Sequence, residues 1–150
     1  MPISNKSLFI KKSNLSGAGL GLFAKIIFRK GDRIVEYKGR RQPWKEVKAE
    51  DGHNGYLLRL SRNLAINALP YKKAFGRFAN DASGLGKTVG LRNNAEYLIY
   101  GDRCFIEATR TINKGDEILV SYGKEFWMLQ KTLKEILPSG KNLPSGPNSR

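Results

Sequence analysis

A chain of 150 residues is long enough to bury one hydrophobic core and fits a single domain. Its formal net charge of +14 comes with 40% hydrophobic and 10% aromatic residues, which excludes a wholly disordered chain. No apolar run is long enough for a transmembrane helix, and the polar N-terminus does not indicate secretion. With one cysteine, Cys104, and one histidine, His53, we expect no internal disulfide, no metal site and no histidine-based catalysis.

The positive charge is distributed unevenly along the chain. Residues 25–48 hold nine Lys and Arg against three acids, and residues 52–80 hold five and no acid. Such a surface attracts polyanions with a strong salt dependence, although solubility alone also explains it. No zinc finger, bZIP region or RNA-binding aromatic signature favours sequence-specific recognition, so any nucleic-acid contact is expected to be non-specific.

The first half of the chain predicts short strands separated by turns. Alternating or apolar runs predict strands over 7–11, 21–28 and 33–37, and a hairpin over 56–60 and 64–67. Between them, residues 43–50 predict one or two helical turns, with Pro43 at an early helical position.

The second half predicts a further hairpin and one helix. Strands over 96–100 and 104–108 flank the turn Gly101-Asp102, and a short strand is expected over 118–120. Apolar residues at helical spacing predict a helix over 126–137, which Pro138 ends. We therefore expect one mainly β domain over 3–137, and a disordered tail over 138–150.

Three segments could carry chemistry, although each has an ordinary structural explanation. Gly17–Ala24 could be only a glycine-rich turn, and Asn80 within Arg77–Ser83 only a turn residue. In the third segment, Gly115–Gly123, the Gly-Asp-Glu turn is expected to be solvated and Tyr122 could be only a strand-end aromatic.

The order and spacing of these segments, with Tyr37-Lys38-Gly39 between the first two, resemble the SET-domain protein lysine methyltransferases. The resemblance covers about residues 8–127 and is closest to minimal members without flanking zinc-binding cysteines. It implies a mainly β, β-clip-like fold of several small curved sheets, with a C-terminal helix. It also implies a pseudoknot, in which the C-terminal segment threads under a loop and meets the asparagine motif.

The resemblance also implies a site for S-adenosylmethionine and a channel for the substrate lysine. The residues implied to bind the cofactor are Gly19, Leu20, Gly21, Asn80, Asp81, Tyr122, Phe126 and Trp127. The residues implied to be catalytic or to line the channel are Tyr122, Tyr37 and Tyr97. The sequence departs from the family pattern at Asp81, where a histidine is usual, and at Val120, where Phe or Tyr is frequent.

The implied reaction is transfer of a methyl group from a sulfonium to a neutral lysine amine. Positioning lowers its barrier, and no covalent enzyme intermediate is needed. By family analogy the substrate is a histone or another basic protein, in the nucleus or on chromatin of a eukaryote, or in the cytoplasm of a prokaryote. A weakly active SET scaffold that binds nucleic acid or chromatin is the alternative, and a metal-dependent hydrolase is disfavoured because His and Cys ligands are few.

Overall fold

Three small antiparallel sheets form the framework of the computed structural model, which describes residues 6–51, 53–83 and 90–121. The first sheet has the order β1 (Leu8–Lys12), β2 (Leu20–Ala24) and β9 (Glu117–Ile118). The second has the order β3 (Arg33–Glu36), β8 (Arg103–Ala108) and β7 (Ala95–Tyr100). The third has the order β4 (Arg40–Pro43), β6 (Leu64–Asn67) and β5 (Leu57–Arg59). The expected mainly β chain with several small sheets is confirmed.

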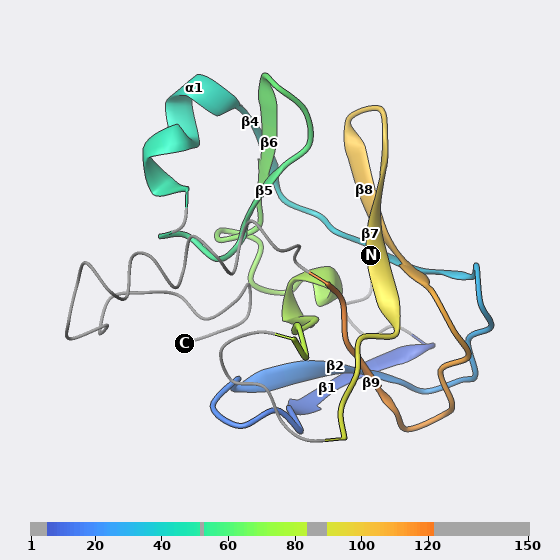
Figure 1. Ribbon diagram of the computed structural model, residues 1–150. Helices are drawn as coiled ribbons and strands as arrows, with labels where there is room; N and C mark the ends of the chain where they lie inside the picture. Colours follow the sequence, from blue (N-terminus) through green and yellow to red (C-terminus); the bar gives the residue numbers. More distant parts are fainter. Residues whose placement is uncertain (1–5, 52, 84–89, 122–150) are drawn as a thin grey trace.

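Helical structure in the described residues is limited to three short elements. α1 (Trp44–Val47) continues into the 3-10 helix η1 (Lys48–Glu50), which together confirm the expected helical turns over 43–50. A second 3-10 helix, η2 (Phe75–Phe78), lies between the first sheet and the other two (green, centre of Figure 1) and contacts β1, β2 and β3. None of the described helices is long and apolar enough to cross a bilayer.

Several element boundaries differ from the predictions. β4 was not predicted because its sequence, Arg-Arg-Gln-Pro, has no apolar alternation, and it forms by pairing with β6. The expected strand 21–28 ends at Ala24, and Phe28 makes only an isolated bridge to Ile112. The expected helix over 126–137 and the tail over 138–150 lie outside the described residues.

A short C-terminal segment joins parts of the molecule that are far apart in sequence. Beyond β9, Leu119 forms a parallel bridge to Asn80 and Val120 one to Ala95. Residues 119–120 therefore lie between the two ends of the segment 80–95, as expected of a threaded C-terminal segment. Ile118 and Val120 are fully buried in the largest core cluster, so hydrophobic burial stabilises this segment.

Candidate functional site

The glycine-rich segment leads directly into β2 and presents its backbone to solvent. Gly19 has φ +74°, a left-handed conformation that glycine adopts without the steric cost of a side chain. The next residue, Leu20, is 47% exposed, while Gly21 is buried. The exposed glycines therefore offer accessible main chain at the start of β2, the central strand of the first sheet, and close approach of a ligand requires such access.

Asn80 connects the glycine-rich segment to the threaded C-terminal segment. Its side chain is 4% exposed, and its Nδ2 donates to the Leu20 carbonyl over 3.0 Å. Its own carbonyl accepts a hydrogen bond of 2.8 Å from the Val120 amide. Hydrogen bonds thus join Leu20 and Asn80, two residues expected to bind the cofactor, to Val120 of the C-terminal segment.

Asp81, which replaces the usual histidine of the family pattern, is buried and hydrogen-bonded within its own loop. Its Oδ1 accepts from the amide and the hydroxyl of Ser83 and from Nδ2 of Asn93, over 2.6 to 2.8 Å. These donors offset part of the cost of burying the carboxylate. Its charge acts on Tyr97, whose pKa is raised chiefly by burial, and also by the neighbouring Tyr37, Cys104 and Asp81.

Two of the expected channel tyrosines lie in ring contact. Tyr37, directly after β3, and Tyr97, on β7, are 5.6 Å apart between ring centroids in an edge-to-face geometry. The Tyr37 hydroxyl donates to the Tyr56 carbonyl over 2.9 Å. Burial raises the pKa of both phenols well above the ordinary value, so both stay protonated and neutral at physiological pH.

The structure adds residues around this tyrosine pair that motif reasoning missed. Arg77 is 6% exposed, and its guanidinium lies 3.9 Å from the ring of the buried Tyr56 while donating to the carbonyls of Ala68 and Leu69. The Tyr37 amide donates to the carbonyl of Cys104, which is also buried. Arg77 belongs to the recognised asparagine motif, but no sequence signal distinguishes Tyr56 from other strand aromatics.

Glu117 differs from the prediction that the Gly-Asp-Glu turn is exposed to solvent. Its neighbour Asp116 is exposed, as predicted for the Gly-Asp-Glu turn, but Glu117 is 5% exposed, so the prediction of a solvated turn is wrong for this residue. The physical reason is its position at the start of β9, where pairing with β2 opposite Phe23 carries the side chain inward.

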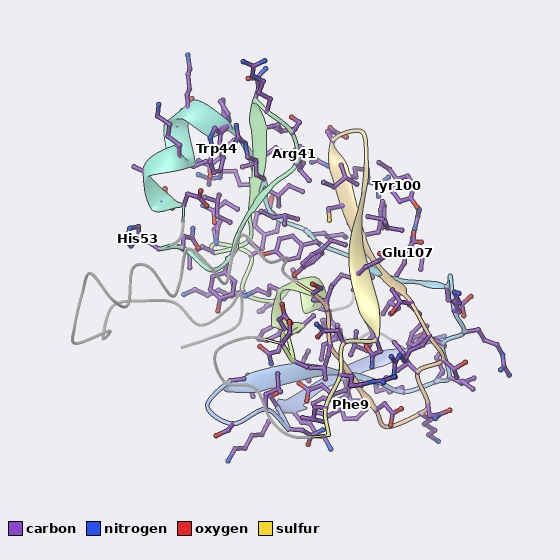
Figure 2. All side chains as sticks on the ribbon, in the orientation of Figure 1. Phe9, Arg41, Trp44, His53, Tyr100 and Glu107 are labelled. Carbon is purple, nitrogen blue, oxygen red and sulfur yellow. The ribbon has the colours of Figure 1, made fainter. Side chains whose placement is uncertain are left out.

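The remaining expected site residues are Tyr122, Phe126 and Trp127, which lie outside the described residues. His53 is exposed and lies on the α1 side of the molecule, away from Tyr100 and Glu107 of the second sheet (Figure 2). The described part of the chain holds no cluster of three or more His, Cys, Asp or Glu side chains that could bind a metal ion.

The family model of the SET domain matches residues 19–123, so this chain belongs to the SET-domain family. A curated relative is histone-lysine N-methyltransferase mes-4 of Caenorhabditis elegans, 30% identical over 118 residues. That match covers 69% of this chain, and the chain spans only 13% of the relative's length.

Solved structures share the fold. A chain in Chaetomium thermophilum Polycomb Repressive Complex 2 bound to GSK126 is 25% identical with a TM-score of 0.63, covering 88% of this chain and 18% of that one. The methyltransferase domain of human PR domain-containing protein 2 is 20% identical with a TM-score of 0.60, covering 80% of this chain and 79% of that one. These similarities confirm that the small curved sheets form the SET architecture expected from the motifs.

Proposed function

We propose that this chain is a protein-lysine N-methyltransferase that uses S-adenosylmethionine. The observation that carries the proposal is the hydrogen bond from Asn80 to the Leu20 carbonyl, in a chain of the SET family. It joins the exposed backbone of the glycine-rich segment to the asparagine motif, and Val120 binds the same asparagine from the segment that leads to Tyr122.

The described residues offer a hydrogen-bond acceptor that suits a ligand with an ammonium group. Nδ2 of Asn80 donates its hydrogen bond to the Leu20 carbonyl, and no described residue donates a hydrogen bond to Oδ1 of Asn80. That oxygen is therefore available to accept from the amino group of S-adenosylmethionine. The cofactor would supply a methyl group on a positively charged sulfur. Gly19 and Leu20 would hold it through their main chain, and Asp81, Gly21, Tyr122, Phe126 and Trp127 complete the proposed binding set.

Tyr37 and Tyr97 support the proposal of a lysine channel. Their edge-to-face contact restricts both rings, and aromatic faces favour a cationic or methylated amine by about 0.5–2 kcal/mol. A lysine has an ordinary pKa of about 10.4, and burial between such rings disfavours its charged form. Because both phenols are neutral, they would orient the amine rather than remove its proton, and Tyr122 would support methyl transfer electrostatically.

We propose a histone or another basic chromatin-type protein as the substrate. The curated relative is named a histone-lysine N-methyltransferase, and one structural relative is a Polycomb Repressive Complex 2. Such a substrate would place the chain on chromatin in a eukaryotic nucleus.

Radiolabelled methyl transfer to core histones and a panel of basic proteins tests this function, with Tyr122→Phe as the control variant. We expect transfer by the wild type and at least a tenfold loss in the variant, together with calorimetric binding of S-adenosylhomocysteine. Absence of binding at high micromolar ligand would overturn the proposal.

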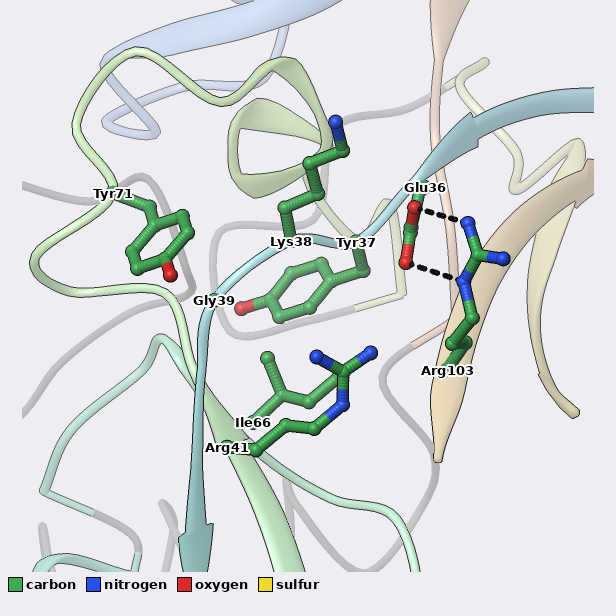
Figure 3. Close-up of a pocket in the computed structure, with 8 residues that line it drawn as sticks. All are labelled: Glu36, Tyr37, Lys38, Gly39, Arg41, Ile66, Tyr71 and Arg103. Atoms are coloured by element: carbon green, nitrogen blue, oxygen red, sulfur yellow. Dashed lines mark hydrogen bonds and ion pairs between the residues drawn. The ribbon is translucent and has the colours of Figure 1, made fainter. Parts of the chain in front are cut away.

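A cationic recess supports the second candidate, non-specific contact with nucleic acid. The recess has a volume of about 270 Å³, and its lining residues are Glu36, Tyr37, Lys38, Gly39, Arg41, Ile66, Tyr71 and Arg103. Arg103 pairs with Glu36, and Arg41 with Asp102, which lies outside the recess. Among the described residues no acid pairs with Lys38, and Figure 3 shows its amine on the opposite side of the Tyr37 ring from Arg41.

Salt-dependent binding to a short DNA duplex tests this contact. Each phosphate contact contributes about 0.9 to the slope of log K against log salt, so Lys38→Glu is expected to reduce that slope by about one or more. Lys25→Glu, an equal charge change at an exposed turn after β2, is the matched control. Equal slopes in the two variants would show that this recess does not bind phosphate.

A further inference from the structure

Glu117 is a buried carboxylate for which the described residues supply no basic partner. It opens β9 and is 5% exposed, and no ion pair joins it to any Lys or Arg of the described ranges. A carboxylate in such a position is costly unless hydrogen bonds replace the lost water. The groups that donate hydrogen bonds to Glu117 therefore identify the part of the chain that this side chain holds in place.

Both donors come from the loop between β1 and β2. The Ser13 hydroxyl donates to Oε2 over 2.6 Å, and the Asn14 amide donates to Oε1 over 2.8 Å. The Ser13 hydroxyl in turn accepts from the Leu15 amide over 3.0 Å, and the Ser13 amide donates to the Gly19 carbonyl over 2.8 Å. The Glu117 carboxylate thus binds the start of the loop at Ser13 and Asn14. Ser13 in turn is hydrogen-bonded to Gly19 at the end of the loop.

The glycine at position 21 leaves the space that this carboxylate occupies. A Cβ atom on Gly21 would collide with Oε2 of Glu117 and lie 3.2 Å from Cα of Ser13. The collision would be with a group held by two hydrogen bonds, so it could not be relieved by a simple side-chain rotation. Glu117 therefore gives the glycine at position 21 a structural reason that needs no ligand.

The main chain of Glu117 contacts the part of the site that contains the asparagine motif and the threaded segment. Its carbonyl accepts from Nδ2 of Asn94 over 2.9 Å, and two residues further on Leu119 forms the bridge to Asn80. Glu117 consequently connects the segment 13–21, which comprises this loop and the first two residues of β2, to the threaded segment directly. This connection is independent of the hydrogen bond between Asn80 and Leu20.

We propose that Glu117 is a positioning residue that sets the segment 13–21 in the geometry that binds the methyl donor. This inference rests on the proposed function, because it concerns the same cofactor site. Its loss should weaken donor binding and raise the KM for the donor, while kcat at saturating donor stays within about twofold of wild type.

The test compares Ser13→Ala, Glu117→Gln and Glu117→Ala with Asp116→Asn as the matched control. Asp116 is the adjacent exposed acid, and among the described residues its side chain accepts only from the Asn113 amide, outside the loop. The Kd of S-adenosylhomocysteine is measured by calorimetry, and amide hydrogen exchange is followed along the chain. We expect Ser13→Ala to weaken binding about tenfold, since it removes one charge-assisted hydrogen bond, and to accelerate exchange over 14–20.

Glu117→Gln keeps an acceptor for Asn14 and an amide that can donate to Ser13, so it should recover most of the binding lost in Glu117→Ala. Asp116→Asn should behave as wild type. Unchanged binding in Ser13→Ala and Glu117→Ala would overturn the inference, and so would weakened binding with accelerated exchange throughout the chain. Failure of the wild type itself to bind S-adenosylhomocysteine would instead overturn the proposed function.

Discussion

At the scale of single residues, the tyrosine pair combines a buried phenol, Tyr37, with a partly buried one, Tyr97, and both are neutral. Tyr37 is 1% exposed and uses its hydroxyl on the Tyr56 carbonyl, and Tyr97 packs edge-to-face against its ring. A phenol held in this way loses little freedom when a substrate side chain arrives. Preorganisation of this kind lowers the cost of positioning.

Tyr37→Phe is expected to lower the free energy of unfolding by about 1 kcal/mol, because it deletes one buried hydrogen bond while keeping the ring. Urea denaturation measures the change. Tyr100→Phe is the control: its hydroxyl bonds Glu107 at the surface, so its loss should cost less than about 0.5 kcal/mol. Equal effects in both variants would contradict the role assigned to the Tyr37 hydroxyl.

The Cys104 thiol is expected to be unreactive in the folded protein. Its side chain is fully buried, and burial, together with the charge of Glu36, raises its pKa to about 12. Only the thiolate is a strong nucleophile, so labelling with a chromogenic disulfide at pH 8 should be negligible until denaturant is added. Rapid labelling of one thiol in native buffer would show that the site is open.

At the scale of elements, glycines at the sheet edges serve two different physical needs. Gly39, which precedes β4, would place a Cβ atom 2.6 Å from the Asn67 carbonyl oxygen and from Cγ2 of Ile66. Gly31, in the turn before β3, has φ +91° and no atom within 4 Å of a Cβ position. The first glycine permits close packing against β6, and the second permits a backbone conformation.

The two glycines therefore predict different costs for alanine. Gly39→Ala should destabilise by about 1–3 kcal/mol or more through overpacking, since the obstacle includes backbone. Gly31→Ala should cost about 1–2 kcal/mol from the left-handed conformation alone. Thermal unfolding measures both costs, and amide exchange distinguishes their causes, because only Gly39→Ala should accelerate exchange along β6. Exchange in β6 unchanged by Gly39→Ala would contradict the packing explanation.

The ion pair between β3 and β8 predicts a pH dependence. Hydrogen bonding to Arg103, reinforced by its charge, lowers the pKa of Glu36 in the folded state. A depressed folded pKa stabilises the protein above the ordinary glutamate pKa, and this contribution is lost as the pH falls through the folded value.

The expected contribution is at most about 1 kcal/mol, because the Arg103 side chain is 54% exposed and water screens the pair. Urea midpoints of wild type and Glu36→Gln should therefore differ at pH 6 and converge near pH 3. A difference that grows on acidification would contradict the sign of the pKa shift.

At the scale of the whole molecule, the fold depends on contacts between distant segments at residues 117–120, which comprise β9 and the threaded segment. The Asn94 side chain binds the main chain here as a neighbouring strand would. Its Nδ2 donates to the Glu117 carbonyl, and its Oδ1 accepts from the Leu119 amide over 2.9 Å. These two hydrogen bonds join residues more than twenty positions apart in sequence. They form only after residues 94 and 117–119 have come together. Folds dominated by non-local pairing form slowly.

Asn94→Ala should lower the free energy of unfolding by about 2–4 kcal/mol, because it leaves a buried carbonyl and a buried amide without partners. Asn113→Ala, at an exposed turn, should change it by less than about 0.5 kcal/mol. Denaturant unfolding measures both. A small effect of Asn94→Ala would show that burial of Ile118 and Val120 alone secures the threaded segment.

The sequence by itself determined the local elements and the identity of the family. The turns at Lys30-Gly31-Asp32 and Gly101-Asp102 and the alternating runs beside them are local signals, and the structure has strands next to both. Motif order likewise indicated Asn80 and the glycine-rich segment, since residue type and spacing are properties of the chain itself. Tyr122, Phe126 and Trp127 remain predictions.

Only the tertiary structure decided what depends on pairing across long sequence distances. The strand character of β4, the burial of Glu117 and the position of Arg77 over Tyr56 each require a partner that local sequence does not specify. A carboxylate in a Gly-Asp-Glu turn is solvated or buried according to whether donors such as Ser13 and Asn14 reach it. Hydrophobic periodicity reports which residues avoid water, but hydrogen-bond partners a hundred residues apart are chosen by the fold.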